Sequence, residues 1–252
     1  MDQPMGGHVA YVCRYTPLPL IHAAGLLPFR VFPEAGCPDR AGSLLHDNLC
    51  PHVKLVLDRV VAGDMPELAG VVVVASCDPM RRLADAWLAA RPYEPLQVVD
   101  LPVSRDHAGV ERFTRELARL RRALETWGGV TIDDASVARS AELYTRLADH
   151  LSRAAQASGS DRARLQTMLN RAVTQDPAEV LVSLEGEDLG GETRGGTSAG
   201  VPLYLFGNVM PHPDAFALLT QCGARVVDDD LCTGSRQLPP MTVDPERDAL
   251  SQ

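Results

Sequence analysis

The sequence predicts an α/β protein made of two Rossmann-like lobes with parallel sheets, which are joined by a helical arm. Residues 71–75 (VVVVA) form an uninterrupted apolar run, as in a central parallel strand that is covered on both faces. Predicted strands and helices alternate over residues 1–104 and again after residue 200. We expect the second lobe to be truncated.

The first lobe, residues 1–104, has clear start and stop signals for its elements. Thr16 can cap a helix with Pro17 in its first turn, and Gly25 can end it. Asp78 can cap a second such helix, with Pro79 in its first turn. The remaining expected elements of this lobe are a strand over 28–32, a loop over 36–42, a helix over 53–61, the continuation of the Asp78 helix to about residue 90, and a strand over 96–101.

The rest of the chain divides into three parts. Residues 105–184 are expected to form a connecting arm of three helices, because apolar residues recur there at helical spacing. Residues 185–200 are rich in glycine and acidic residues and are expected to be a flexible loop. Residues 201–252 are expected to form the partial second lobe and a tail. The expected elements are helices over 106–127, 131–156, 160–173 and 214–222, and strands over 201–207 and 224–228.

A weak internal repeat relates the two lobes. Residues 23–31 (AAGLLPFRV) and 221–227 (QCGARVV) both indicate a helix, a glycine and a short strand. In each case a loop and a cysteine follow, namely Cys50 in the first lobe and Cys232 in the second. The repeat indicates two related lobes whose cysteines face one cleft. Sites in open α/β sheets lie beyond the carboxyl ends of the strands, and we expect Cys77 and Cys232 to lie there.

Composition narrows the functional classes. The net charge of −9 argues against a nucleic-acid-binding surface. No apolar run approaches the length that would span a bilayer, so we expect no membrane segment. The first ten residues lack the features of an export signal, which favours a cytoplasmic location. In that compartment the six cysteines would be reduced, and metal or redox chemistry is a better interpretation than disulfides.

The spacing of the cysteines favours one kind of metal site. The chain has no close Cys-x-x-Cys pair of the type that marks structural zinc. Widely separated cysteines on different loops suit a cluster better, although a buried cysteine can also simply fill space. The candidate ligands are Cys13, Cys50, Cys77 and Cys232, with Ser76 and Asp78 as supporting neighbours of Cys77. We expect Cys37 and Cys222 to be packing residues, and Cys222 in particular to lie in the core at a helix end.

Other polar groups are weaker candidates. His22, His46 and His52 lie near the cysteines in sequence and are expected to be solvated or on helix surfaces. Residues 228–230 (DDD) could hold a hard metal, but a solvated loop next to Cys232 is the expected structure. Arg81 and Arg82 could meet a phosphate or could lie on a solvated helix face.

Five segments in order resemble the 2-hydroxyacyl-CoA dehydratase family, which includes benzoyl-CoA reductase subunits and double-cubane cluster proteins. They are residues 13–17 (CRYTP), 21–28 (IHAAGLLP), 48–51 (NLCP), 76–78 (SCD) and 223–236 (GARVVDDDLCTGSR). The resemblance implies an oxygen-sensitive iron–sulfur cluster, either a 4Fe–4S cluster or a double-cubane cluster. It implies Cys50 and Cys77 as cluster ligands, with Cys13 and Cys232 matching motifs of the double-cubane branch.

The resemblance also implies a function. Such a subunit would take part, as a hydro-lyase, in removing water from a 2-hydroxyacyl-CoA thioester through a ketyl radical. It would act with a homologous partner subunit, or as a homodimer, and would receive one electron from an ATP-hydrolysing activator. Two alternatives remain open: a non-catalytic or electron-transfer iron–sulfur protein of the same fold, and a reductase of the benzoyl-CoA or double-cubane type.

Overall fold

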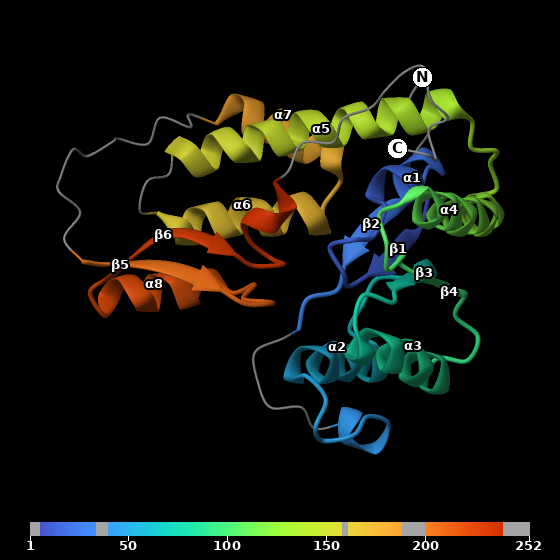
Figure 1. Ribbon diagram of the computed structural model, residues 1–252, viewed down its shortest axis with the longest axis horizontal. Coiled ribbons are helices and arrows are strands. Elements are labelled where there is room, and N and C mark those ends of the chain that lie inside the picture. The colour runs from blue at the N-terminus through green and yellow to red at the C-terminus, as the bar shows by residue number, and fades with distance from the viewer. Residues whose placement is uncertain (1–5, 34–39, 158–160, 188–199, 239–252) are drawn as a thin grey trace. The chain divides into compact units, whose positions relative to one another are not determined.

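A computed structural model describes residues 6–33, 40–157, 161–187 and 200–238 of the chain (Figure 1). The chain divides into two compact units, with the boundary between Ser140 and Ala141. We call these the first unit and the second unit, and each is described by itself. None of the helices in the described ranges is both long and apolar enough to cross a membrane.

The first unit is built on a four-stranded parallel sheet with the strand order β2-β1-β3-β4. This confirms the predicted α/β class and the central position of the 71–75 run, which forms most of β3 and is buried throughout. The strands are β1 (His8–Tyr11), β2 (Leu27–Arg30), β3 (Leu68–Val74) and β4 (Leu96–Val99).

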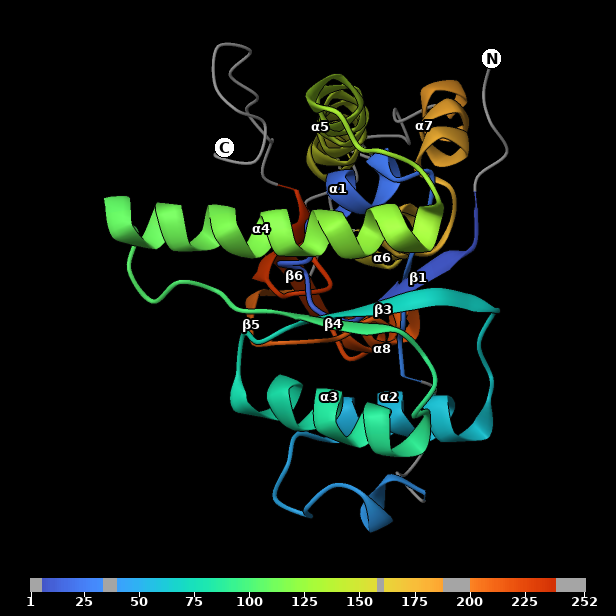
Figure 2. The same cartoon turned by 90° about the vertical axis from the view of Figure 1, so that its right-hand side faces the viewer.

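Helices cover both faces of this sheet, as a parallel sheet requires (Figure 2). One face carries α2 (Pro51–Ala62) and α3 (Asp78–Ala90), which share a core with Val71 and Val73. The other face carries α1 (Leu18–Ala23) and α4 (His107–Gly128), which pack with Val72 and Val74. Successive side chains of β3 point to opposite faces of the sheet, so they contribute in turn to two separate cores.

Two predicted helix caps are wrong. The Thr16 hydroxyl donates to the Cys13 carbonyl at 2.8 Å, and Pro17 takes the N-cap position of α1. Asp78 is the first residue of α3, and Cys77 is its N-cap. Both helices therefore begin one residue away from the expected cap, and neither has a side-chain cap hydrogen bond.

The long helices belong to both units. Asp106 caps α4 by accepting from the Gly109 amide at 2.8 Å, and Gly129, with a φ of 65°, ends it as expected. The predicted arm of residues 105–184 does not stand apart in packing, because Leu120 and Leu124 complete the core of the first sheet. The later helices are α5 (Asp134–Ala157), which crosses the unit boundary, α6 (Arg162–Thr174) and α7 (Pro177–Gly186).

Helix α7 was not predicted. It is capped by Asp176, whose carboxylate accepts from the Ala178 amide at 2.8 Å, and it packs with α5 and α6 in an apolar core of the second unit. Asp-Pro followed by Glu179 is a helix start signal that the sequence does contain. The expected loop of residues 185–200 lies mostly outside the described residues. The described part of the expected loop at 36–42 includes a short 3₁₀ turn, η1 (Ala41–Ser43).

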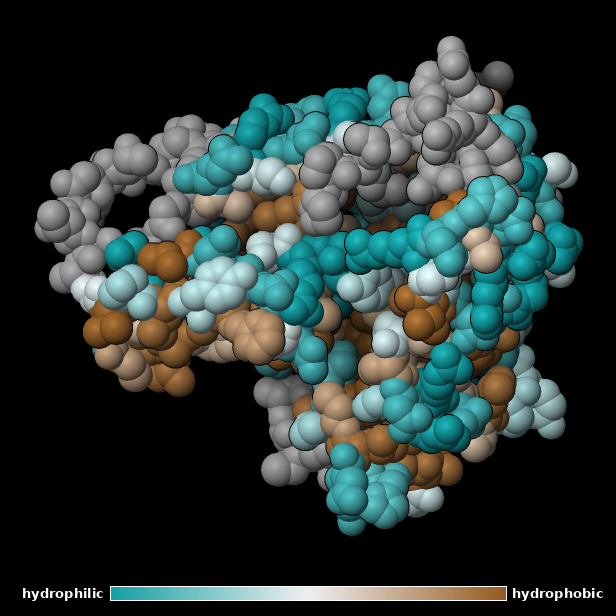
Figure 3. All heavy atoms as spheres, in the orientation of Figure 1, coloured by the Kyte–Doolittle hydropathy of each residue, from teal (hydrophilic) through white to brown (hydrophobic). Residues whose placement is uncertain are grey.

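The second unit also contains a parallel pair of strands. β5 (Val201–Phe206) pairs with β6 (Ala224–Asp230), and α8 (Pro213–Gln221) connects them and packs on β6. β5 leaves apolar side chains on the surface, where Val201 is 65% and Phe206 82% exposed. Figure 3 shows hydrophobic residues on the surface of this part of the molecule. Residues beyond β6 form η2 (Ser235–Gln237).

The internal repeat is confirmed at the level of secondary structure. Gly25 joins α1 to β2, and Gly223 joins α8 to β6. Both glycines have positive φ values, 69° and 82°, and each donates its amide to a carbonyl three residues earlier in the helix. Only glycine adopts this conformation without strain, which explains why the two segments look alike in sequence.

Candidate functional site at the carboxyl edge of the first sheet

The strand order places a topological switch point between β1 and β3. From β1 the chain moves outward to β2, and from β3 it moves in the opposite direction to β4. Open α/β sheets bind their ligands beyond the carboxyl ends of the strands at such a point. Cys13 follows β1 and Ser76-Cys77 follows β3, so three of the predicted site residues lie beyond the carboxyl ends of these two strands.

Cys13 and Ser76 meet at this point. The Cys13 sulfur lies 3.2 Å from the Ser76 hydroxyl, across 63 residues of sequence. Cys13 is half-buried and packs against both cores of the first unit, as expected for a residue at the edge where the two faces of the sheet meet. The fold therefore brings Cys13 next to the residue that precedes Cys77.

Cys50 and Cys77 occupy equivalent places on two neighbouring helices. Cys50 is the N-cap of α2 and Cys77 the N-cap of α3, and α2 packs against α3 on one face of the sheet. The helix N-terminus carries a partial positive charge, which favours a thiolate or another anion near it. Neither thiol caps its own helix, and Cys50 also packs against the apolar core on that face of the sheet. Cys77 is exposed and Cys50 is half-buried.

A buried arginine adds positive charge near the same edge. Arg30, at the end of β2, is 2% exposed and donates its Nε to the carbonyl of Val12 at 3.1 Å, next to Cys13. His52, two residues after Cys50, has a buried Nδ1 without a hydrogen-bond partner in the described structure. Burial and, to a smaller extent, the charge of Arg30 lower the pKa of His52 to about 4. His52 is therefore neutral at pH 7. It lies in the first turn of α2, as a helix-surface histidine would, but it is half-buried instead of fully solvated.

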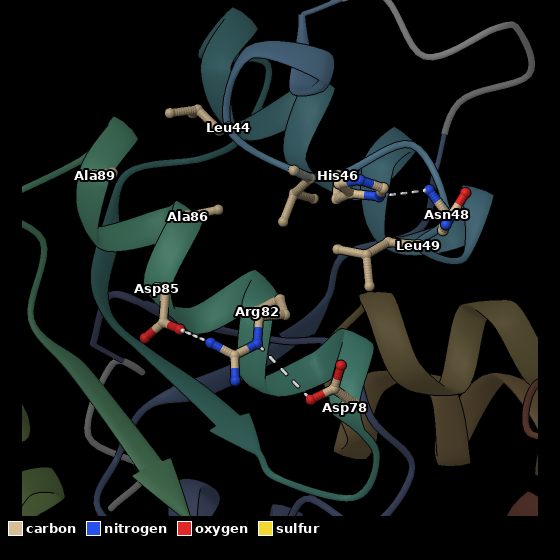
Figure 4. A pocket seen from close by; sticks show the side chains of 10 residues that line it. Leu44, His46, Asn48, Leu49, Asp78, Arg82, Asp85, Ala86 and Ala89 are labelled. Carbon is tan, nitrogen blue, oxygen red and sulfur yellow. Dashed lines mark hydrogen bonds and ion pairs between the residues drawn. The ribbon is translucent and has the colours of Figure 1, made fainter.

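A pocket of about 480 Å³ opens between α3 and the segment before Cys50 (Figure 4). Asn48 and Leu49 line one wall and lead directly into Cys50, while Asp78 on the other wall follows Cys77. Arg82 lies between Asp78 and Asp85, at 3.7 Å and 3.1 Å, so its charge is already offset. The rest of the lining is largely apolar, from Leu44, Leu45, Ala86 and Ala89, together with His46.

In the second unit, Cys232 lies in a loop that polar contacts hold on both sides. Its amide donates to the Asn208 carbonyl at 2.6 Å, and Arg236 donates Nη1 to its sulfur at 3.2 Å. The expectation of a solvated loop over residues 228–230 is wrong, because these residues form the end of β6. Asp229 is 5% exposed and accepts from the Leu231 and Ser235 amides at 3.1 Å and 2.9 Å, so it organises the loop instead of binding a hard metal.

Several predicted site residues have other surroundings. Asp78 turns to Arg82, and His22 pairs through Nδ1 with the Ser140 hydroxyl at 2.9 Å. Cys222 lies at a helix end as expected, but it is exposed, so its predicted place in the core is wrong. Cys37 lies outside the described residues. Within the described residues, no three His, Cys, Asp or Glu side chains are already gathered as a metal site.

Two contributors were missed by sequence reasoning. Arg30 has an ordinary strand sequence around it, and only the fold reveals its burial beside Val12. The contact between Arg236 and Cys232 likewise depends on the turn before η2, which only the fold reveals.

Comparisons with known proteins identify the family of this chain. Residues 13–251 match the family described as 2-hydroxyglutaryl-CoA dehydratase, D-component. The chain is 28% identical to a subunit of benzoyl-CoA reductase from Thauera aromatica over 139 residues, 54% of this chain and 36% of that protein. It is 26% identical to the beta subunit of lactoyl-CoA dehydratase from Anaerotignum propionicum over 140 residues, 55% of this chain and 37% of that protein.

Each alignment covers only about a third of the curated relative's length. The family match, in contrast, begins at Cys13 and includes Cys50, Cys77 and Cys232. It extends through nearly all of the chain. The chain therefore belongs to the 2-hydroxyglutaryl-CoA dehydratase D-component family.

Proposed function

We propose that this chain is an iron–sulfur subunit that eliminates water from a 2-hydroxyacyl-CoA thioester by one-electron chemistry. It would act with a homologous partner subunit, or as a homodimer, and receive its electron from an ATP-hydrolysing activator. The observation that carries the proposal is the meeting of Cys13 with the Ser76-Cys77 segment at the switch point of the first sheet, in a chain of this family.

The residues at this edge suit an iron–sulfur cluster by their chemistry. Thiolates are the ligands that such clusters take, and Cys13, Cys50 and Cys77 are free thiols that are at least partly accessible. The two helix N-termini and the buried charge of Arg30 favour the negative charge of thiolates and cluster together. We propose Cys13, Cys50 and Cys77 of the first unit and Cys232 of the second unit as ligands.

When bound, a cluster of this kind supplies a single low-potential electron for the ketyl-radical elimination. The protein's own residues would position the thioester and limit access of water. The pocket beside Cys50 and Cys77 has an apolar wall of leucine and alanine that suits the acyl part of a thioester. Arg82 in that pocket is paired with two carboxylates and Arg81 with Asp100 at 3.3 Å, so neither offers a free positive charge for a phosphate.

The proposal is tested by anaerobic reconstitution of the full chain with iron and sulfide. Electron paramagnetic resonance of the reduced protein should show an iron–sulfur signal, which air should abolish. Addition of activator, ATP and reductant should then convert a 2-hydroxyacyl-CoA to the enoyl-CoA, if necessary only after the partner subunit is supplied. A chain that takes up no iron under these conditions would refute the proposal.

A reductase of the benzoyl-CoA type is the second candidate, and the similarity to a benzoyl-CoA reductase subunit favours it. The same reconstituted protein separates the two candidates. Consumption of an aromatic acyl-CoA with net uptake of electrons would indicate the reductase. Dehydration without net consumption of electrons would indicate the dehydratase, because the electron is recovered in each cycle.

A further inference from the structure

The side chain of Arg236 is held in one orientation by Asp230. Its Nη2 donates to Asp230 Oδ2 at 2.7 Å, and its Nε bonds the other oxygen of the same carboxylate. A two-point contact of this kind fixes the plane of the guanidinium group. The remaining nitrogen, Nη1, then points at the Cys232 sulfur at 3.2 Å.

The loop that carries Cys232 is fixed independently of Arg236. Thr233 is fully buried, its hydroxyl accepts from the Met210 amide at 2.9 Å, and its carbonyl accepts from Gln166 at 2.7 Å. A side chain at Gly234 would collide with the Asp229 carboxylate, so the turn requires glycine. The Cys232 backbone thus stays in place whether or not Arg236 is present.

The ion pair between Arg236 and Asp230 does not by itself explain why Nη1 points at the Cys232 sulfur. Both side chains are partly exposed, and a pair of that kind contributes no more than about 1 kcal/mol. A neutral thiol is a weak acceptor, whereas a thiolate or a cluster sulfur accepts a strong, charge-assisted hydrogen bond. The third guanidinium nitrogen is therefore placed for an anionic sulfur.

We propose that Arg236 is a positioning residue that orients the Cys232 sulfur and raises the reduction potential of the cluster this cysteine would hold. The proposal rests on the proposed function, since it assumes that Cys232 is a ligand. Hydrogen bonds to ligand sulfur and positive charge both favour the reduced, more negative state of an iron–sulfur cluster. Asp230 serves the same end indirectly, by holding the guanidinium group.

The test compares Arg236→Met, Arg236→Lys and Cys232→Ser in the anaerobically reconstituted full chain. Arg146→Met is the matched control, because Arg146 also pairs with a carboxylate, Glu185 at 2.7 Å, and is an exposed arginine of the second unit. Iron content is counted, and the midpoint potential is measured by redox titration followed by electron paramagnetic resonance.

We expect the equilibrium constant for reduction to fall about tenfold in Arg236→Met, which is ~59 mV for a one-electron couple. The constant should fall less in Arg236→Lys, because lysine keeps the positive charge but loses the two-point contact of the guanidinium group. In Arg146→Met it should match the wild-type value. If Arg236→Met cannot hold the cluster, Arg236→Lys carries the comparison. If the Arg236 variants retain iron and their midpoint potentials are unchanged, the inference about Arg236 is wrong but the proposed function is unaffected. Full iron and an unchanged signal in Cys232→Ser would instead remove Cys232 from the ligand set, and the inference with it.

Discussion

The protein contains two strand–helix–strand motifs, β1–α1–β2 in the first unit and β5–α8–β6 in the second unit. The two motifs have the same kind of connection but differ in what surrounds them. Each has a parallel strand pair and a helix that ends at a glycine with positive φ. The first lies in a four-stranded sheet that is buried on both faces. The second is a two-stranded sheet with an exposed apolar strand.

This difference extends to how each unit positions its cysteines. In the first unit, apolar packing fixes the strand ends and helix starts that carry Cys13, Cys50 and Cys77. In the second unit, a network of carboxylates, arginine and backbone amides fixes Cys232. A cysteine side chain can thus be placed by an apolar core or by a polar loop, and the two arrangements should fail under different conditions.

Trp87→Ala should give the largest loss, because it removes the centre of the first core. Trp87 is fully buried and donates its indole nitrogen to Glu94 at 2.8 Å. Truncation of a buried tryptophan costs about 3–5 kcal/mol. Urea unfolding followed by circular dichroism measures the change. A loss under about 1 kcal/mol would mean that packing does not hold the first unit together.

Asp229→Ala should rank second and should act on the Cys232 loop. It leaves the Leu231 and Ser235 amides without their acceptor and takes a carboxylate from beside Arg162. Each unsatisfied buried group costs about 1–3 kcal/mol. The control is Asp214→Ala on the exposed start of α8. The rate of amide hydrogen exchange in residues 229–235 should rise in Asp229→Ala and not in Asp214→Ala. Equal exchange in both variants would contradict the claim that polar contacts hold this loop.

Acid should weaken the first unit through His52. Its pKa is about 4 in the folded protein and near 6.5 when unfolded, so the unfolded state binds the proton first as pH falls. Stability is therefore complete above pH 6.5 and declines between pH 6.5 and 4, by roughly 1.4 kcal/mol for each unit of pKa difference.

The His52 effect is isolated by comparing the pH dependence of urea unfolding in two variants. His52→Gln should flatten the profile between pH 6.5 and 4. His107→Gln, which changes an exposed histidine on α4, should leave the wild-type profile intact. A wild-type slope that persists in His52→Gln would assign the acid sensitivity to other groups.

Phe206→Ser should have the smallest effect on unfolding, under about 0.5 kcal/mol, because this side chain is 82% exposed on β5. β5 is also an edge strand of a two-stranded sheet, and an exposed edge can pair with another chain, which adds a second readout. Sedimentation should show weaker association in the variant if the strand meets another chain. A loss above 1 kcal/mol at low protein concentration would mean that Phe206 is buried within the chain.

Much of the first unit could be predicted from the sequence, because its signals are local. The apolar run of β3, the proline after Cys77 and Gly25 each specify one conformation with few alternatives. The helices expected over 53–61 and from Asp78 to about residue 90 are present for the same reason, and Cys50 and Cys77 are their N-cap residues.

What could not be predicted depends on contacts between distant segments. The burial of Arg30 and His52 arises only when β1, β2 and α2 assemble. The role of Asp229 was misjudged because three consecutive aspartates indicate solvent exposure by composition, while the strand directs alternate side chains to opposite faces. Membership of α4 in the first core likewise follows from packing and not from its own charged sequence.

The central claim is that cysteines at the carboxyl edge of the first sheet hold an iron–sulfur cluster. It is tested most directly by counting iron and sulfide in anaerobically reconstituted wild type, Cys77→Ser and Cys222→Ser. Both of these cysteines are exposed and both lie at a helix end, so the two variants are matched. We predict wild-type iron in Cys222→Ser and loss of the native cluster signal with most of the iron in Cys77→Ser. A full and spectroscopically unchanged cluster in Cys77→Ser would contradict the account.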